Sequence, residues 1–264
     1  FVVGSKSVKC HPHPGGLDLR GAVQYSCNPY FCNAFRAFVD NRKFVSSENG
    51  YRIWRDYVLS FGVGRKIGVD LPHELSGLVP TVEYYDRYYG KKRWKASTIF
   101  SLGIGQGELG VTPLQMANIM CVIANKGFYF TPHIVKKIDA KPNKTRSLGI
   151  KHYAKVDASH FDAIQDGMQK VVEAGTARVA RFGEVVICGK TGTAQNPHGK
   201  DHSLFVAFAP RDNPKIAIAV MVENSGFGAT WAAPVASLMM EQYLTDSITR
   251  PELYERMING NLLP

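Results

Sequence analysis

Apolar residues recur at helical spacing twice near the start of the chain. One short segment follows Asp18, a residue suited to an N-cap, and the next begins at Pro29, which suits a first helical turn. The repeated positions are Leu17, Leu19 and Val23, then Phe31, Phe35 and Phe38. Ser26 and Asn28 are therefore predicted to lie on a tight connection between two helices, where short polar side chains can point into a cleft. The alternative is that they only end one helix and cap the next.

Three longer helices are predicted further along the chain. One begins at Pro113 with Thr112 as its N-cap and closes at Gly127, another is capped by Ser159, and the last follows Pro234. The expected apolar faces are Leu114, Ala117, Met120 and Ala124; Phe161, Ile164, Met168, Val171 and Val172; and Val235, Leu238, Met239, Tyr243 and Leu244. We interpret these positions as core and not as a cofactor site.

Strand patterns are confined to the second half of the chain. A β-branched run at residues 185–187 indicates a buried strand, and two further strands are expected at about 204–208 and 216–222. Residues 211–214, Arg-Asp-Asn-Pro, would join the last two as a hairpin turn. Because strands joined by a short turn pair antiparallel, the pattern predicts an antiparallel sheet whose faces are covered by helices.

Two polar stretches are predicted to lie on the surface. Lys-rich residues 136–155 suggest an exposed hairpin or loop, and the Tyr-, Arg- and Lys-rich residues 83–95 suggest a long surface excursion near the substrate groove. No internal repeat or low-complexity tract is present.

The composition indicates one globular domain. The chain has 264 residues, 45% of them hydrophobic, which is enough to bury a large core and is far from the composition of disordered proteins. No apolar run reaches 18 residues and no signal segment opens the chain, so no membrane span is expected within it. The net charge of +10 would suit an acidic polymer, but the basic residues are spread along loops. No basic-aromatic motif indicates nucleic acid.

The most informative motif is Gly189-Lys190-Thr191-Gly192-Thr193, directly after the β-branched run. Lys190 supplies a positive charge, and the hydroxyls of Thr191 and Thr193 supply oriented donors. The glycines let a ligand approach the backbone, because they carry no Cβ. The motif therefore indicates a site for an anion, although a Lys-Thr-Gly tripeptide alone also occurs at ordinary strand ends.

With Ser26-Cys27-Asn28 ahead of Lys190-Thr191-Gly192, the chain resembles the transpeptidase domain of class B penicillin-binding proteins, most closely the elongation-type enzymes. The resemblance extends over nearly the whole chain. Its further anchors are Ser101-Leu102-Gly103-Ile104-Gly105-Gln106-Gly107-Glu108, Val111-Thr112-Pro113-Leu114-Gln115-Met116-Ala117, Gly175-Thr176-Ala177, Phe205-Val206-Ala207-Phe208-Ala209-Pro210 and Val222-Glu223-Asn224-Ser225-Gly226.

The resemblance implies an α+β fold, with an antiparallel sheet covered by helices on both faces and an all-helical subdomain. It also implies a serine-type D,D-transpeptidase that cross-links D-Ala-D-Ala stem peptides of peptidoglycan and is acylated by β-lactams. Such enzymes act at the periplasmic face of the inner membrane, within a membrane-bound cell-wall synthesis complex. No cofactor and no nucleic acid partner is implied.

Residue roles also follow from the resemblance. Ser26 would relay a proton to the leaving group, Asn28 would fix the donor amide and the catalytic Lys, and Lys190 would keep that neighbouring Lys neutral enough to act as a base. Substrate binding would fall to Thr191, Gly192 and Thr193. The two hydroxyls would hold the terminal carboxylate, and the backbone N–H of Thr193 would form half of the oxyanion hole.

One feature departs from the family pattern. No Ser-x-x-Lys occurs in residues 1–264, although that motif carries the nucleophilic Ser and its activating Lys. Only 25 residues precede Ser26, so we expect the nucleophile, a pedestal and a membrane anchor upstream of Phe1, with residues 1–264 as the C-terminal portion of the transpeptidase domain. The rival interpretation is a degenerate, non-catalytic relative.

Five cysteines exclude a fully paired disulfide framework within the chain. Cys121 and Cys188 lie in apolar segments and are expected to be inert core residues. Cys10, His11, His13 and Cys27 offer four ligands that tetrahedral zinc would accept, and a disulfide between Cys10 and Cys27 is as plausible. Free thiols are the third possibility.

Two other functions stay open beside the transpeptidase. A β-lactamase or D,D-carboxypeptidase of the same fold would hydrolyse the acyl-enzyme, and a silent penicillin sensor or scaffold would not react. The segments at 103–108 and 223–226 favour the transpeptidase, and the segment from Ser101 to Ala117 favours elongation over division.

Overall fold

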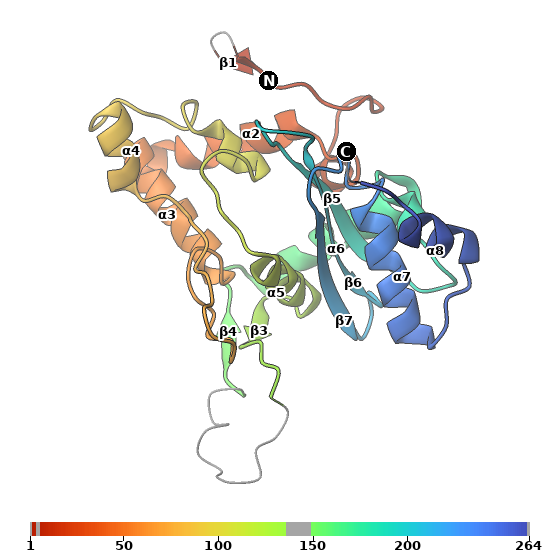
Figure 1. Ribbon diagram of the computed structural model, residues 1–264. Helices are drawn as coiled ribbons and strands as arrows, with labels where there is room; N and C mark the ends of the chain where they lie inside the picture. Colours follow the sequence, from red (N-terminus) through yellow and green to blue (C-terminus); the bar gives the residue numbers. More distant parts are fainter. Residues whose placement is uncertain (1, 4–5, 136–148, 263–264) are drawn as a thin grey trace. The chain divides into compact units, whose positions relative to one another are not determined.

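The computed structural model describes residues 2–3, 6–135 and 149–262, which fall into two compact units. The first unit comprises the described parts of 1–10, 27–122 and 127–157, and the second comprises those of 11–26, 123–126 and 158–264. Figure 1 shows both units, and each is described by itself below.

The first unit is mainly helical. Its elements are α2 (Asn28–Val39), η1 (Arg42–Phe44), α3 (Ser47–Ser60), α4 (Val82–Tyr89), η2 (Phe100–Ile104) and most of α5 (Pro113–Ala124), with the two-stranded antiparallel sheets β1 (Val2–Val3) with β2 (Lys6–Ser7) and β3 (Phe128–Phe130) with β4 (Lys151–Tyr153). Aromatic residues of α2, α3, α4 and the α4–η2 segment form its core. Within this cluster, the side chains of Tyr51, Tyr85 and Trp94 are at most 1% exposed.

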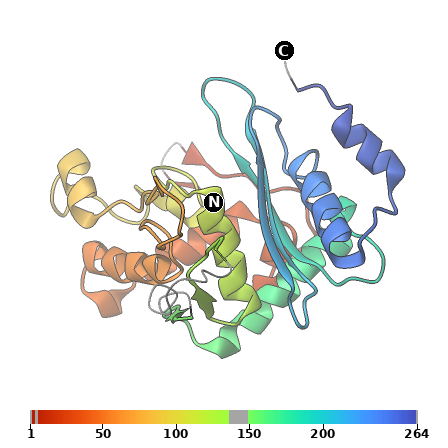
Figure 2. The same cartoon turned by 60° about the horizontal axis from the view of Figure 1, so that its bottom comes forward.

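The second unit contains a three-stranded antiparallel sheet with strand order β5-β6-β7. Its elements are α1 (Leu19–Gln24), η3 (Ala158–His160), α6 (Phe161–Ala174), η4 (Arg178–Ala180), β5 (Cys188–Ala194), β6 (His202–Ala209), β7 (Ile216–Val222), α7 (Ala232–Thr245) and α8 (Pro251–Ile258). Helix α6 packs on β5 and α1, and α7 packs on β6 and β7. Figure 2 views the three strands almost edge-on, with α7 alongside them. The expected α+β class with an antiparallel sheet is confirmed.

Local sequence signals place several element boundaries correctly. The Asp18 side chain accepts a hydrogen bond from the N–H of Gly21 at 2.8 Å and caps α1, and Thr112 caps α5 in the same way through the N–H of Gln115. The strand at 216–222 is confirmed in full. Ser159 does not cap α6, because it lies inside η3 and the helix begins two residues later.

The β-branched run at 185–187 is not part of the strand, which begins at Cys188. The register pairs Cys188 with Phe208, so residues 186 and 187 would lie opposite the end of β6 at Ala209 and Pro210. Proline has no N–H to donate at position 210, so the regular ladder is interrupted, and the next bond between the two segments runs from the Arg211 N–H to the Val186 carbonyl at 2.8 Å. The strand is therefore formed by the Lys-Thr-Gly motif itself and not by the apolar run before it.

The prediction of a surface excursion at 83–95 holds for most of its residues, which are exposed, but it is wrong for Tyr85 and Trp94. Residues of this stretch form α4, and Tyr85 and Trp94 lie in the core of the first unit. The Tyr85 hydroxyl donates to Glu108 at 3.0 Å, and the Trp94 Nε1 donates to Asp86 at 2.9 Å. Aromatic residues with a polar tip can be buried when that tip has a partner, which explains why a polar stretch supplies core residues.

Helix α7 buries only part of the predicted face. Leu238 is buried as predicted, together with small residues and Met240, whereas Met239 and Tyr243 are 54% and 62% exposed and line an apolar groove with α8. Of the predicted loop at 136–155, residues 136–148 lie outside the described residues, and 151–153 form strand β4.

Candidate active site

Ser26 lies in the short connection that follows α1, as its sequence context predicts. Its backbone has φ +53°, in the left-handed region that non-glycine residues seldom adopt, and its N–H donates to the carbonyl of Val23 at 3.2 Å. The chain therefore turns sharply at Ser26 before α2 begins at Asn28. This turn fixes the direction of the Ser26 side chain.

Lys190 lies in β5, 164 residues after Ser26, and the fold brings the two side chains together. The Lys190 Nζ donates to the Ser26 Oγ at 2.7 Å and to the backbone carbonyl of Thr191 at 2.8 Å. Both residues belong to the second unit. One residue of each motif that suggested a site on its own, Ser26 and Lys190, is thus part of one cluster.

Burial lowers the pKa of Lys190 to about 8, because the half-buried ammonium loses hydration. An ordinary lysine has a pKa of about 10.4 and stays charged throughout the neutral range. Lys190 therefore carries its charge below about pH 8 and loses it within the range in which enzymes work. Both oxygens that accept from Lys190 are neutral, so neither contact balances its positive charge. A bound anion would do so.

Strand β5 is an edge strand of the three-stranded sheet, so one of its two sides does not pair with β6. A ligand that lies along such an edge can reach side chains on both faces of the strand. Thr191 presents its hydroxyl to that of Thr176, with 2.7 Å between the two oxygens. Gly192 is closely packed. A Cβ at Gly192 would lie 3.1 Å from Leu204, and a Cβ at Gly228 would lie 2.6 Å from the carbonyl oxygen of Gly192.

Helix α6 contacts both elements that carry the cluster, α1 before Ser26 and β5 with Lys190. Asp166 accepts hydrogen bonds from Arg20 of α1 at 2.9 Å and from Arg211 of the β6–β7 turn at 2.6 Å, and the Arg20 hydrogen bond is the main reason why its pKa is lowered. Gly167 lets α1 approach closely, because a Cβ there would come within 2.8 Å of Val23. The positions of α1 and of the Ser26 turn are thus set by contacts with α6.

Asn28 is the first residue of α2 and belongs to the first unit, whereas Ser26 and Lys190 belong to the second. Its expected contacts with a substrate amide and a catalytic Lys stay a prediction. Sequence reasoning missed Thr176, Asp166 and Arg211. Thr176 is part of the Gly-Thr-Ala anchor, so the motif signalled its importance but not its contact.

A family model described as the penicillin binding protein transpeptidase domain matches residues 3–241. The chain belongs to this family. Among curated proteins, the chain is similar to the peptidoglycan D,D-transpeptidase MrdA of Acinetobacter baumannii, with 32% identity over 94% of this chain and 38% of that protein. The chain thus spans well under half the length of this relative.

Solved structures of penicillin-binding proteins share the fold. Pseudomonas aeruginosa PBP2 in complex with WCK 5153 is 36% identical with a TM-score of 0.73, over 88% of this chain and 50% of that chain. A chain of a peptidoglycan synthase complex that coordinates polymerization and crosslinking is 28% identical with a TM-score of 0.70, over 89% of this chain and 39% of that one. The anchors that carried the resemblance therefore identified the family and the fold correctly.

The cysteines of this penicillin-binding protein domain are not joined in disulfides within the described residues. Cys10 and Cys27 both belong to the first unit, and their sulfur atoms lie within 4.8 Å of each other. His11 and His13 belong to the second unit, so zinc binding by these four residues stays a prediction. Burial raises the pKa of the Cys121 thiol and raises that of Cys188 to about 12. Cys188 is confirmed as a core residue, and its inertness stays a prediction.

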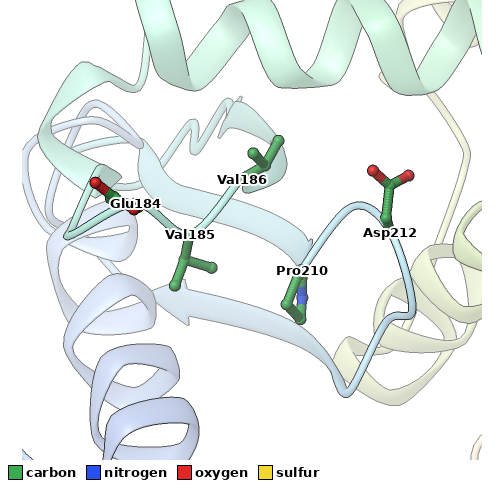
Figure 3. A pocket seen from close by; sticks show the side chains of 5 residues that line it. All are labelled: Glu184, Val185, Val186, Pro210 and Asp212. Carbon is green, nitrogen blue, oxygen red and sulfur yellow. The ribbon is translucent and has the colours of Figure 1, made fainter.

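A shallow pocket of about 370 Å³ lies beside the segment before β5 and the turn after β6. Figure 3 shows Glu184 and Asp212 at its two sides, with Val185, Val186 and Pro210 between them. None of these residues belongs to the cluster around Lys190, so we do not assign substrate binding to this pocket. Among the described residues, no helix has both the length and the apolar character needed to cross a bilayer.

Proposed function

We propose that this chain is the C-terminal portion of the catalytic domain of a peptidoglycan D,D-transpeptidase, which works through an acyl-serine intermediate. The observation that carries the proposal is the 2.7 Å hydrogen bond from Lys190 to Ser26. It joins the serine of the Ser-x-Asn motif to the lysine of the Lys-Thr-Gly motif, beside an edge strand of the sheet. The similarity to MrdA of A. baumannii supports the same activity.

In this proposal, a serine supplied from upstream attacks the carbonyl of the D-Ala-D-Ala bond, and its own lysine takes the hydroxyl proton. The tetrahedral intermediate collapses, the C–N bond breaks, and the leaving D-alanine amine must gain a proton. Ser26 is suited to that transfer, because its oxygen accepts from Lys190 while its own hydrogen stays available to donate. The amine of a neighbouring stem peptide then attacks the acyl-enzyme, releases the serine and forms the cross-link.

The terminal carboxylate of the donor peptide would lie along the β5 edge. Lys190 supplies the positive charge, and the hydroxyls of Thr191 and Thr193 donate to the carboxylate oxygens. The N–H of Thr193 would bind the developing oxyanion, and Gly192 would present its backbone to the substrate at the strand edge. Asn28 would hold the substrate amide and the upstream lysine.

The same chemistry accounts for the other expected ligands and for the location. A β-lactam presents a strained amide and a carboxylate, so it would acylate the same serine, as the family name indicates. A stem-peptide substrate places the enzyme at the periplasmic face of the membrane, anchored by an upstream segment. Assembly with a glycan polymerase is supported by the related chain in the peptidoglycan synthase complex.

The decisive experiment incubates the full-length protein with a fluorescent penicillin and measures covalent labelling. We expect stable labelling of the wild type and loss of at least 10²-fold in the labelling rate for Lys190→Ala, since one charged donor to the reacting ligand is removed. Lys215→Ala is the matched control, because that lysine is exposed at the end of the β6–β7 turn.

Each outcome separates one interpretation. Rapid turnover of the penicillin would indicate a hydrolase of the same fold. Absence of labelling in a protein that contains an upstream Ser-x-x-Lys would indicate a silent sensor or scaffold. If Lys190→Ala unfolds at the growth temperature while Lys215→Ala does not, Lys190 has a structural role.

A further inference from the structure

We propose that Thr176 is a positioning residue for anion recognition, and that its hydroxyl aligns the Thr191 hydroxyl toward the carboxylate of the acylating ligand. This inference rests on the proposed function and goes beyond it, because it assigns a residue outside the Ser-x-Asn and Lys-Thr-Gly motifs. It also gives a role to the Gly-Thr-Ala anchor at 175–177. The two hydroxyl oxygens lie 2.7 Å apart, which is a short hydroxyl–hydroxyl hydrogen bond.

The chemistry of the ligand decides the direction of this bond. A carboxylate offers only acceptors, so Thr191 must use its single O–H to donate to it. When the ligand is bound, the hydrogen bond between the two threonines must then run from Thr176 to Thr191. A hydroxyl that accepts one hydrogen bond donates a stronger one, so Thr176 strengthens the contact between Thr191 and the anion.

The backbone around Thr176 is fixed on both sides. The N–H groups of Gly175 and Ala177 both donate to the carbonyl of Val171, at 3.2 and 3.0 Å, which folds the segment back onto the last turn of α6. At Gly175 a Cβ would approach the Gln24 carbonyl to 2.6 Å, so only glycine lets the chain pass the end of α1 here. Ala177 is fully buried.

The strand side of the pair is equally constrained. Helix α6 packs on β5, where a Cβ at Gly189 would lie 3.3 Å from a methyl group of Val172. The carbonyl of Thr191 already accepts from Lys190 at 2.8 Å. Thr191 is thus held by a cation at its backbone and by Thr176 at its side chain, and both contacts favour an anion at the strand edge.

The test compares two acylating agents that differ only in the anion. Full-length protein is labelled with a fluorescent penicillin that keeps its carboxylate and with the methyl ester of the same compound, and the ratio of the two labelling rates is measured. Thr176→Val keeps the shape of the side chain and removes the hydroxyl. We expect this variant to lower the acid-to-ester ratio by about threefold to tenfold, with the ester rate unchanged.

Two further variants complete the design. Thr176→Ser restores a hydroxyl and is expected to keep the wild-type ratio. Thr245→Val is the control and is expected to leave the ratio unchanged, because it removes a hydroxyl that donates to the carbonyls of Glu241 and Ser247 at the end of α7. An equal fall in both rates for Thr176→Val, or an unchanged ratio, would overturn the positioning role while the proposed function stands. If the wild type is labelled by neither agent, the proposed function fails and this inference fails with it.

Discussion

Each unit buries polar side chains, but with opposite chemical consequences. In the first unit, Tyr51 donates to the carbonyl of Pro80 at 2.8 Å, and Tyr85 donates to Glu108. Burial raises the pKa of Tyr51 and that of Tyr85 far above the usual value for tyrosine. In the second unit, burial lowers the pKa of Lys190 to about 8.

The same physical cause, loss of hydration of the charged form, acts in both places. For a tyrosine it removes ionisation from the accessible pH range, so the aromatic cluster stays neutral and serves stability. For a lysine it moves ionisation into the neutral range, so the side chain can change charge during a reaction. The sign of the ionised group and its ordinary pKa together decide whether burial moves ionisation into the neutral range, as at Lys190, or out of reach, as at Tyr51 and Tyr85.

The largest expected effect concerns the aromatic cluster. Tyr85→Ala removes a fully buried ring that packs against Tyr51 and Trp94, and should lower the free energy of unfolding by about 3–5 kcal/mol. Urea denaturation of the variant and of wild type measures this loss. The control is Tyr88→Ala on the same helix, where the side chain is 69% exposed and a change within about 0.5 kcal/mol is expected. Equal effects of the two substitutions would contradict the assignment of Tyr85 to the core.

A titration compares the two units directly. Lys190 should lose its proton near pH 8. NMR of ¹³C-labelled lysine side chains follows this titration, and the Lys190 signal is assigned as the one that is missing in Lys190→Ala. Tyr51 and Tyr85 should stay protonated until the protein unfolds, as read by ultraviolet absorption of tyrosinate. Above about pH 10 the unfolded chain releases tyrosine protons that the folded chain retains, so stability should fall as the pH rises.

The consequence for ligand binding has a definite sign. As Lys190 loses its charge above about pH 8, the labelling rate with a carboxylate-bearing penicillin should fall by up to tenfold per pH unit, whereas the methyl ester should be less affected. A Lys190 signal that titrates near pH 10.4 would show that its ammonium is hydrated like that of an ordinary lysine.

The smallest expected effect concerns the support of the Ser26 turn. Asp166→Asn removes the charge that bridges Arg20 and Arg211, and should lower the labelling rate by about twofold to fivefold, because these groups are partly exposed. If α1 loosens and water enters, the pKa of Lys190 should rise toward its usual value. Asp162→Asn is the control, since its partner Lys126 lies outside α1. If the labelling rate falls while the pKa of Lys190 stays unchanged, Asp166 does not act by holding α1 and the Ser26 turn in place.

Local signals in the sequence predicted much of the fold. Asp18, Thr112 and the alternation in 216–222 each depend on neighbours a few residues away, and each prediction is confirmed. The contact between Ser26 and Lys190 spans 164 residues, and only the order of two family motifs pointed to it.

The failed predictions share a physical origin in tertiary partners. The burial of Tyr85 and Trp94 depends on Glu108 and Asp86 satisfying their polar tips, and no pattern within 83–95 reveals that. The start of β5 depends on where Pro210 ends the neighbouring strand. The contact of Thr176 with Thr191 requires the segment after α6 to lie beside β5. The Gly-Thr-Ala motif alone does not reveal that position.

The φ of +53° at Ser26 sets stability against activity at one residue. A side chain in this conformation costs roughly 1–2 kcal/mol, and glycine would adopt it without that cost. Ser26→Gly relieves that cost, but it also removes an acceptor of the Lys190 ammonium and, with it, the proposed proton relay. A selection for thermostable variants of this domain would therefore reward the replacement only as far as the relieved strain exceeds the lost hydrogen bond, and penicillin labelling must be screened in parallel.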